Sequence, residues 1–435
     1  MEPADRIPGT DRLDMEGDIA SELVAGADAF LQEKLSRSVE RRRAYWDRDT
    51  SSGEAYTTSV DGNREALARM VGLRETRPDS AGLTYVSTTE HPSLVAKSSR
   101  FDVHAVSWAA FSDVRGEGLL LSPNTAFVAN VIAIPDAGQT PEQIAGLTEG
   151  VPEPSQYARR LAASGCRVVI PCLINRSKAI RGVTHRDYVY RSAFELGRHL
   201  IGYELQKVFA VVDWFEKLND GLQTGVLGWG EGGLLSLYAA AIDQRIDAAC
   251  VSGYFDSRED VWREPIDRNV FGLLEQFGDA EIASLVSPRP LVIEACGFPE
   301  SRVEEGDGSG APYELKTPLV DRVKAEVDRY RNLVRGLDDR TNLIASQDGQ
   351  GTFGTDQTLG GFLSGLGATL STGESGGLEV LQGVDTDARH ARQVAELHRH
   401  NQRVLQSCAQ TRDQFFEGLD TGTMDAFLGS VEPYR

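Results

Sequence analysis

Histidine is scarce in this sequence. Seven histidines occur in 435 residues, and none lies between His199 and His390. Because imidazole is the side chain that most readily exchanges protons near neutral pH, this long central stretch lacks the usual general base. Proton transfer there would need a histidine brought in from elsewhere in the fold, or carboxylates.

Basic charge is low relative to acidic charge. The chain has 45 Lys and Arg against 65 Asp and Glu residues, which gives a formal net charge of −20. Binding to nucleic acids or anionic membranes requires a basic surface, so this composition argues against both kinds of partner. No apolar run is long enough to span a membrane.

Features of exported or disulfide-stapled proteins are also missing. Five cysteines, an odd number scattered over the chain, do not make a disulfide framework. Residues 1–18 contain no basic start followed by an apolar core, so no signal peptide is predicted and a cytoplasmic location is expected. Hydrophobic residues make up 40% and charged residues 25% of the chain, as in an ordinary globular protein.

Both ends of the chain predict helices outside the main body. Apolar residues recur at three- and four-residue spacing from Asp18 to Trp46, which predicts one long amphipathic helix. Another long helix is predicted from Asp385 to Phe416, after a linker rich in Gly, Ser and Thr. We expect a helical extension over residues 1–80, a central domain over 81–370, and a linker with a helical tail over 371–435.

The central domain begins with short β patterns and then alternates strands with helices. Gly, Pro and Asn separate the first runs, between Leu83 and Leu121, which is typical of antiparallel edge strands. The later apolar runs predict strands covered on both faces. They are Phe127–Ile134, Arg167–Leu173, Gly225–Leu227, Ala248–Tyr254, Leu291–Ala295 and Asn342–Ser346. This order predicts an α/β fold with a doubly wound, mostly parallel sheet and a crevice at the carboxyl ends of its strands.

The stretch Thr224–Asp243 has an unusual turn between a strand and a helix. The strand ends in Gly228-Trp229-Gly230-Glu231-Gly232, and an apolar helix follows at once. Such a unit is the setting of a nucleophile elbow, in which a tight turn lifts one side chain above the sheet. The glycines are expected because a Cβ at the flanking positions would clash. The serine of the pattern G-x-S-x-G would fall at position 230, where this chain has glycine.

These residues resemble the α/β-hydrolase superfamily, in its branch near dienelactone hydrolases and acetyl-xylan-esterase-like proteins. The resemblance covers about Leu83 to Gly367. Besides the elbow, it rests on Ile134-Pro135-Asp136-Ala137, Tyr188–Trp214, Val251–Phe255 and Ser287–Leu291. It implies the α/β-hydrolase fold with helical additions at both ends and, for an active member, hydrolysis of carboxylic esters. Some proteins of this kind carry a second hydrolase domain, so a second domain or another copy of the chain is an expected partner.

A hydrolase of this family needs a nucleophile, a histidine base and a carboxylate. Gly230 has no side chain with which to attack, and the loop after the last strand, residues 347–354, contains no histidine. Glu294 and Glu300 are available as the carboxylate. The resemblance therefore implies a hydrolase-like domain that is catalytically degenerate and serves ligand binding or partner docking.

The oxyanion-binding part of such a site consists of backbone groups, so it does not depend on the missing side chains. The resemblance implies that the N–H of Glu231, and one from Asp136 or Ala137, point into the crevice at the helix N-terminus. The Glu231 carboxylate is expected to stabilise the first turn of its own helix.

Alternative residue sets keep an active esterase open, with small acyl or carbohydrate esters as substrates. Glu231 with Asp348 or Glu294 would form a paired-carboxylate site. His185 would reach the crevice on its loop. Two serines near strand ends are candidate replacement nucleophiles, Ser252 and Ser346.

No cofactor or metal is predicted. Residues 349–354 match G-x-G-x-x-G after a predicted strand, but the last-strand loop of a hydrolase already accounts for them. Three histidines of the C-terminal helix cannot share one helix face, so they do not predict a metal site. They are His390, His398 and His400.

Overall fold

The computed structural model describes residues 16–79, 82–89, 91–180, 182–304, 312–371, 373 and 376–435, without the side chains of residues 179 and 180. The strands are β1 Leu83–Tyr85, β2 Leu94–Ser98, β3 Phe101–Phe111, β4 Val114–Pro123, β5 Ala129–Ile134, β6 Cys166–Pro171, β7 Lys178–Ile180, β8 Val183–Thr184, β9 Thr224–Trp229, β10 Ala248–Ser252, β11 Leu291–Ala295, β12 Ser301–Val303, β13 Tyr313–Leu315, β14 Thr341–Ala345 and β15 Leu378–Val380.

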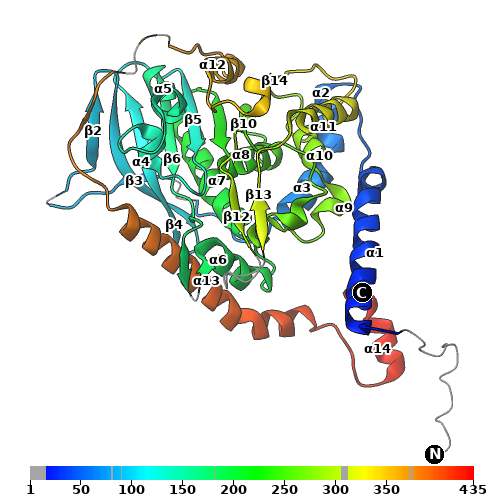
Figure 1. Ribbon diagram of the computed structural model, residues 1–435. Helices are drawn as coiled ribbons and strands as arrows, with labels where there is room; N and C mark the ends of the chain where they lie inside the picture. The colour runs from blue at the N-terminus through cyan, green and yellow to red at the C-terminus, as the bar shows by residue number, and fades with distance from the viewer. Residues whose placement is uncertain are drawn as a thin grey trace, which may run out of the picture.

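The helices surround the sheet that most of these strands form (Figure 1). They are α1 Ile19–Arg41, α2 Gly53–Ser59, α3 Asp61–Met70, α4 Pro141–Ala145, α5 Tyr157–Ala163, α6 His185–Phe194, α7 Leu200–Leu218, α8 Glu231–Ile242, α9 Leu273–Gln276, α10 Asp279–Ser284, α11 Val320–Leu333, α12 Asp356–Gly365, α13 Thr386–Phe415 and α14 Met424–Ser430. Short 3₁₀ turns are η1 Arg42–Tyr45, η2 Glu153–Ser155, η3 Val261–Arg263, η4 Ile266–Arg268, η5 Gln347–Gly349 and η6 Glu432–Tyr434.

One large mixed sheet forms the centre of the molecule. Its strands lie in the order β14-β11-β10-β9-β5-β6-β4-β3-β2-β15, and β1 pairs with β3. Neighbours from β14 to β6 are parallel, whereas β4, β3, β2 and β15 pair in antiparallel fashion. The α/β fold with a mostly parallel sheet is confirmed, and so are the antiparallel edge strands before it.

The central strands are buried on both faces, as their apolar sequences predict. Every residue of β5 and β6 is buried. Asn130 is the polar exception in β5, and its Oδ1 accepts a hydrogen bond from Arg167 Nη1 at 2.7 Å. Arg167 also forms an ion pair with Asp220 at 2.7 Å. A buried amide is tolerated here because it has a partner.

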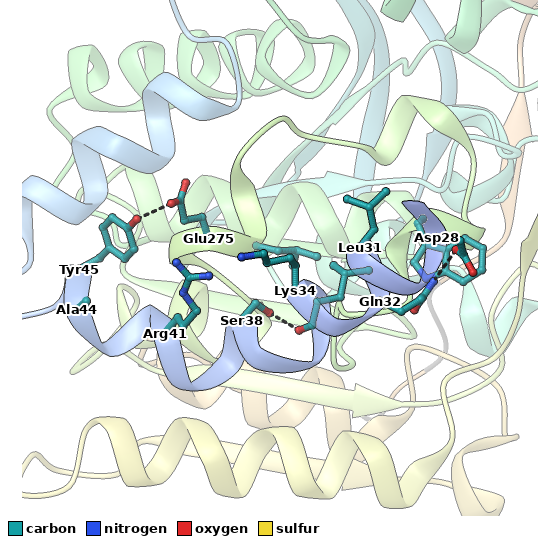
Figure 2. Close-up of a pocket in the computed structure, with 12 residues that line it drawn as sticks. Asp28, Leu31, Gln32, Lys34, Ser38, Arg41, Ala44, Tyr45 and Glu275 are labelled. Carbon is teal, nitrogen blue, oxygen red and sulfur yellow. Dashed lines mark hydrogen bonds between the residues drawn. The ribbon is translucent and has the colours of Figure 1, made fainter. Parts of the chain in front are cut away.

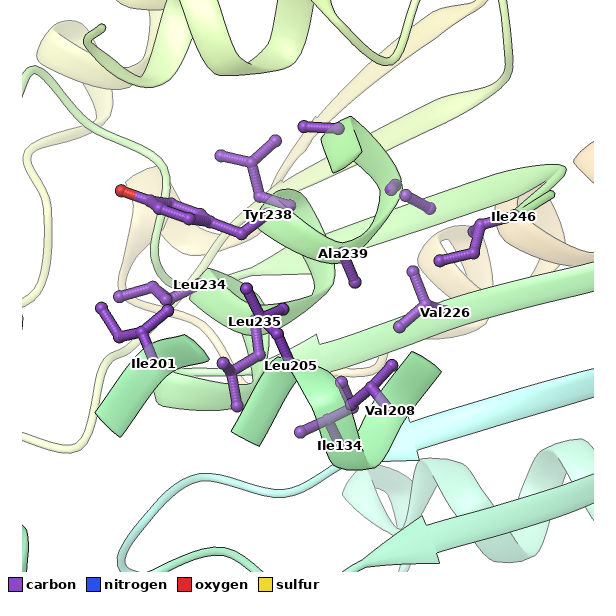
Figure 3. Close-up of a cluster of buried hydrophobic side chains, with 14 of the residues drawn as sticks. Ile134, Ile201, Leu205, Val208, Val226, Leu234, Leu235, Tyr238, Ala239 and Ile246 are labelled. Carbon is purple, nitrogen blue, oxygen red and sulfur yellow. The ribbon is translucent and has the colours of Figure 1, made fainter. Parts of the chain in front are cut away.

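Apolar residues pack on both sides of the sheet. One cluster joins the sheet to α3, α7, α8, α10 and α11, and the other joins it to α5 and α12. Figure 3 shows the first cluster where α7 and α8 meet, with Leu205 beside Leu235, Val208 beside Ile134, and Val226 of β9 close to α8. The helix that begins at the glycine turn is therefore held by packing over its whole length.

The N-terminal helix is shorter than expected and is largely unpacked. It begins after Asp18, whose side chain caps it, and ends at Arg41 instead of continuing to Trp46, because the chain tightens into the turn η1. Ser38 is its buried residue. Figure 1 shows α1 at one side of the body, where its contacts are with η1 and α9.

The C-terminal segment is joined to the main body. β15 pairs with β2, and α13 packs against β4 and α6. Arg389 donates to both oxygens of Glu142 at 2.8 and 2.7 Å, and Tyr203 donates to Asn401 at 2.6 Å. These buried polar contacts hold the first half of α13. Among the described residues, no helix combines the length and the apolar character needed to cross a bilayer.

The docking of α13 should weaken in mild acid. His390 Nε2 accepts a hydrogen bond from the N–H of Asn175 at 3.0 Å, and its ring lies 4.7 Å from that of His185. Burial, and then the nearby His185 and Lys207, lowers the pKa of His390 to about 4. An unfolded histidine titrates near pH 6.5. The unfolded state therefore binds more protons between these values, so stability falls as the pH falls through that window.

We expect amide hydrogen exchange in α13 to accelerate, after correction for the intrinsic rates, between about pH 7 and about pH 4.5. His390→Gln retains an acceptor without a titrating proton and should reduce this change. His91→Gln, at an exposed histidine, serves as the control. An acid response of His390→Gln equal to that of the native chain would contradict this assignment.

Candidate functional site

The turn between β9 and α8 is a single glycine. Gly230 has φ 61° and ψ −119°, a conformation that strains most side chains but not glycine. Two residues away on either side, Gly228 and Gly232 are also required to be glycine, because backbone atoms approach them closely. A Cβ on Gly228 would meet the backbone of Gly232, and a Cβ on Gly232 would meet that of Ile134. The strand, tight turn and helix predicted from the sequence are present at these positions.

The carboxylate of Asp136 lies beside Gly230. Its Oδ1 accepts a hydrogen bond from the N–H of Glu231 at 2.8 Å, and its Oδ2 accepts one from Gly138 at 2.6 Å. A Cβ on Gly230 would lie 2.5 Å from Asp136 Oδ1 and 3.2 Å from Pro299 Cγ. Helix N-termini attract anions, because their first N–H groups lack partners and the helix dipole is positive there. At the N-terminus of α8, Asp136 is that anion.

Two of the predicted oxyanion donors are therefore engaged. The N–H of Glu231 donates to Asp136, and the N–H of Asp136 donates to Gln139 Oε1 at 3.1 Å. For Ala137, the described residues provide no acceptor of its N–H. The expectation that the N–H of Glu231 points free into the crevice is wrong, because it donates to the Asp136 carboxylate. Of the two alternatives for the second donor, the N–H of Asp136 is also engaged, and that of Ala137 stays a prediction.

The Glu231 side chain contacts three arginines. Its Oε1 lies 2.9 Å from Arg186, and its Oε2 lies 2.6 Å from Arg176 and 2.8 Å from Arg268. Arg186 also pairs with Glu204 and Asp267, at 3.0 and 2.5 Å. This cluster of buried charges joins the loop after β6 and the elements α6, α7 and η4 to the first residue of α8.

The cluster keeps Glu231 ionised. Burial alone would raise the pKa of its carboxyl group, but Arg268, Arg186 and Arg176 outweigh burial and lower it to about 2. A carboxylate held in this way accepts hydrogen bonds and is a poor proton donor near neutral pH. Glu231 was expected to stabilise the first turn of its helix. In the structure it is also the buried counter-ion of three arginines.

Glu294 connects β11 to the loop after β14. Its carboxylate accepts hydrogen bonds from the N–H groups of Gly354 and Thr355, at 2.9 and 3.1 Å. The hydroxyls of Thr355, Thr358 and Ser252 also donate to it. Because these donors occupy both oxygens, Glu294 fixes the loop in place and has no histidine partner among the described residues.

The other carboxylate candidates lie at the surface. Glu300 is exposed and accepts a hydrogen bond from the N–H of Thr317 at 3.2 Å. Asp348 is exposed in the turn η5, with a φ of 54°. Glu231 is buried among arginines instead of facing either of them. The structure does not bring Glu231, Asp348 and Glu294 into one cluster of acids.

The histidines lie elsewhere. His185 begins α6, and its ring packs edge-on against His390 of α13. His398 contacts Tyr188, and His400 contacts Glu75. Each of the three histidines on α13 therefore has a different partner, and among the described residues no three metal-ligating side chains gather into a cluster.

An aromatic pair covers the elbow where the last-strand loop approaches it. The rings of Trp229 and Phe353 stack with centroids 4.0 Å apart and an interplanar angle of 16°. Trp229 Nε1 donates to the carbonyl of Gly297 at 2.8 Å. Phe353 belongs to the loop in which a hydrolase of this fold would carry its histidine, so this position holds a ring without a proton-transferring nitrogen.

Two serines and a cysteine near the strand ends lack a histidine partner among the described residues. Ser252 donates to Glu294 and lies 3.3 Å from Cys296 Sγ. Burial raises the pKa of the Cys296 thiol far above its usual value. Ser346 Oγ is buried without a hydrogen-bond partner. Among the described residues, none of these groups bonds to an imidazole nitrogen.

Sequence reasoning missed the side chains that shape this region. It treated Asp136 as a backbone donor, and it singled out His185 where the adjacent Arg186 enters the cluster. Arg176 and Arg268, which follow predicted strands, were a possible signal. A glutamate that starts a buried helix, as Glu231 does, needs cationic partners, and these arginines provide them. Their convergence depends on the folding of the loops, which spacing along the chain does not encode.

Two cavities open at the carboxyl ends of the strands, beside this region. One, of about 390 Å³, is lined by Asp256, Arg263 and Arg322, and the other, of about 490 Å³, by Glu300 and Gln350. Neither is lined by Gly230, Glu231 or Asp136. Directly at Gly230, the space for a side chain is occupied by Asp136 and Pro299.

If Asp136 is the anion of this helix terminus, a free carboxylate should replace it. Asp136→Ala loses two hydrogen bonds to backbone N–H groups, so we expect a destabilisation of about 1–3 kcal/mol. Formate should restore part of this loss, because an anion that binds the folded state alone raises stability with its concentration. Thermal unfolding with increasing formate measures both effects.

Matched salt controls are essential for this test. Asp348→Ala, at an exposed aspartate, should show only the formate response of the native chain, and chloride at equal ionic strength should not rescue Asp136→Ala. Equal responses of Asp136→Ala and the native chain to formate would show that the vacated site does not bind anions.

Comparison with known proteins gives matches of structure but not of sequence. The chain matches no protein-family model and no curated protein at a significant level. A structure from Bacteroides fragilis, provisionally described as an acetyl xylan esterase, has a TM-score of 0.53 at 14% identity, over 78% of this chain and 85% of that one. A glucuronoyl esterase from Solibacter usitatus has a TM-score of 0.47 at 12% identity, over 71% and 93%. Acetyl Xylan Esterase 1 from Thermoanaerobacterium has a TM-score of 0.40 at 14% identity, over 71% and 91%.

At these sequence identities the similarity concerns the fold alone. The Bacteroides structure, with its TM-score of 0.53, is the match on which this conclusion rests. In this chain the fold comprises antiparallel strands that precede a parallel part, and a glycine turn between β9 and α8. The chain has the α/β-hydrolase fold.

Proposed function

We propose that this chain is a non-hydrolytic member of its fold, one that serves binding and docking instead of ester cleavage. The observation that carries the proposal is the Asp136 carboxylate, which bonds to the N–H of Glu231 and lies against Gly230. Ester hydrolysis requires an attacking atom at the turn and a free N–H for the oxygen of the tetrahedral intermediate. Gly230 supplies no such atom, and the N–H of Glu231 already has an anionic partner.

An alternative is an esterase of acyl or carbohydrate esters that uses a non-standard set of residues. The description of the Bacteroides structure favours this alternative. The N–H of Ala137, which has no acceptor among the described residues, would be the donor left for an oxyanion. Ser252, Ser346 and the exposed Asp348 would have to supply the chemistry.

Ester hydrolysis assays distinguish the two proposals. With p-nitrophenyl acetate, acetylated xylan and a methyl glucuronate ester, we expect the native chain to match the rate in buffer. Gly230→Ser should be equally inactive, because its Cβ would clash with Asp136 and no imidazole is available to activate the hydroxyl. A carbohydrate esterase with an intact triad is the positive control.

Turnover by the native chain above that of buffer, lost in Ser252→Ala, Ser346→Ala or Asp348→Asn, would establish the esterase alternative. Asp348→Asn alters an exposed side chain and should leave the fold intact. Glu231→Gln is unsuitable for this purpose, because removing a buried partner from an ion cluster costs about 3–5 kcal/mol.

We further propose that the docking partner is a second copy of this chain. Several large apolar residues of α1 are exposed: Leu23, Val24, Phe30 and Leu31. Figure 2 shows the groove of about 600 Å³ between α1 and the body, with Leu31 and Lys34 on the helix and Glu275 opposite. The end of α13 and α14 expose a further set: Leu405, Phe415, Phe416, Met424 and Leu428. Helices with uncovered apolar faces gain stability by packing against another surface.

The charges of these two regions are complementary. Residues 18–33 contain four acidic residues and no Lys or Arg, whereas residues 397–412 contain three arginines and no acidic residue. Arg403 already pairs with Asp113, and Arg399 and Arg412 have no acidic partner among the described residues. In a twofold-symmetric dimer, the acidic helix of each copy would lie against the basic helix of the other copy, so the same contact would form two times.

Sedimentation velocity tests this pairing. We expect the native chain to sediment as a dimer at micromolar concentration and to dissociate as the salt concentration rises. Leu31→Glu, at a residue 57% exposed, should shift it to monomer, whereas Leu319→Glu, at a residue 64% exposed, should not. A native chain that remains monomeric in low salt would refute the pairing.

We also propose a cytoplasmic location for this chain. The five cysteines are free thiols, as is usual for proteins in a reducing compartment.

A further inference from the structure

Another cavity, whose residues are distant in sequence from the glycine turn, combines arginines with exposed phenylalanines. It has a volume of about 390 Å³ and lies between the end of α3, the end of α6 and the residues before α9. Arg69, Arg74 and Arg198 contribute its cationic wall, and Phe194 and Phe271 its aromatic wall. Small-molecule sites usually have about 300–1,000 Å³ and mix apolar walls with a few polar groups.

Two of the arginines have no anionic partner. Arg198 pairs with Glu75 at 2.8 Å, but Arg69 and Arg74 have no carboxylate within ion-pair distance among the described residues. Burial, and then the neighbouring Arg198 and Arg69, lowers the pKa of Arg74, and the nearby Glu75 offsets only part of this effect. The guanidinium groups therefore repel one another in a chain whose net charge is −20. A bound anion would remove that repulsion.

The remaining polar groups do not neutralise the wall. His199 is buried at the base of the cavity, and burial lowers its pKa to about 4, so it is neutral at pH 7. Its Nε2 lies 3.1 Å from the carbonyl of Asn269. Glu275 is the acidic residue of the lining, and it accepts a hydrogen bond from Tyr45 at 2.6 Å. Glu75 pairs with Arg198 from outside the lining, so the three arginines face two carboxylates in all, Glu75 and Glu275, and the excess charge is positive.

The phenylalanines are unusually exposed for their size. Phe271 is 83% exposed and Phe194 is 41% exposed. Uncovered aromatic rings of this size are a common feature of binding surfaces, because covering them removes apolar area from water. Because these rings line the same cavity as Arg69 and Arg74, a ligand that fits it would have an apolar part and an anionic part.

We propose that this cavity binds a small organic anion, with a carboxylate or phosphate between Arg69 and Arg74 and an apolar group against Phe194 and Phe271. Guanidinium groups match both oxyanions with paired hydrogen bonds. The site goes beyond the proposed function: none of its residues takes part in the glycine turn or in the contacts of Asp136, so binding here does not depend on whether the crevice hydrolyses esters.

Titration calorimetry with phenyl phosphate and benzoate tests the proposal, with benzyl alcohol and inorganic phosphate as partial ligands. We expect saturable binding of at least one aromatic anion. Benzyl alcohol and inorganic phosphate should each bind at least about tenfold more weakly, because each lacks one of the two groups. The tighter of phenyl phosphate and benzoate identifies the preferred head group. Neither anion is a carboxylic ester, so turnover at the crevice cannot mimic binding.

Variants separate this cavity from general attraction to positive charge. Arg69→Gln and Arg74→Gln should each weaken binding by at least about tenfold, and Phe271→Ser should weaken it without changing the salt dependence. Arg340→Gln, at an exposed arginine outside the cavity, is the control. Absence of saturable binding by the native chain, or equal losses in Arg340→Gln and Arg74→Gln, would overturn the proposal.

Discussion

The carboxylate of Asp136, bonded to the N–H of Glu231, determines what the crevice of this protein can hold. A helix that starts at the carboxyl end of a parallel strand presents unpaired N–H groups and a positive dipole, and such a terminus needs an anion or water as its partner. In this chain the partner is covalently part of the protein and comes from the loop after β5. It fits because Gly230 has no Cβ, which would lie only 2.5 Å from its oxygen. The missing side chain and the inserted carboxylate are therefore two parts of one arrangement.

Behind the turn, buried charges fix the elements that surround the crevice. Arg176, Arg186 and Arg268 come from three segments of the chain and meet at Glu231. Each charge would be costly alone in the interior, and together they satisfy one another. The neighbouring Glu294 ties the loop after β14 to β11 in the same way, through donors from backbone and hydroxyl groups. Glu231 and Glu294, which could act as acids or bases in an enzyme, are thus committed to structural contacts and are not available as free acids at this edge of the sheet.

The glycine turn and the strands of the parallel part, β5, β6, β9, β10, β11 and β14, could be predicted from the sequence, because apolar runs and glycines report burial and close approach directly. The order of the strands in the sheet was not predicted. Gly228 and Gly232 are examples: their spacing predicted a turn without room for a Cβ, and a Cβ on either would indeed meet backbone, that of Gly232 itself or that of Ile134. The site itself was less predictable. Asp136 was expected to offer its N–H and instead offers its carboxylate, since the direction of a side chain in a loop depends on packing across the sheet. The end of α1 at Arg41 was also missed, because apolar periodicity continues into η1 while the backbone tightens.

Covalent labelling tests the central claim, that the crevice holds no activated nucleophile, most directly. The native chain would be incubated with a serine-directed fluorophosphonate beside an esterase with an intact triad, and the intact masses of both proteins measured. The account predicts an unmodified mass for this chain and complete modification of the esterase. A stoichiometric adduct that peptide mapping assigns to Ser252, Ser346 or another hydroxyl or thiol at the strand ends would contradict it.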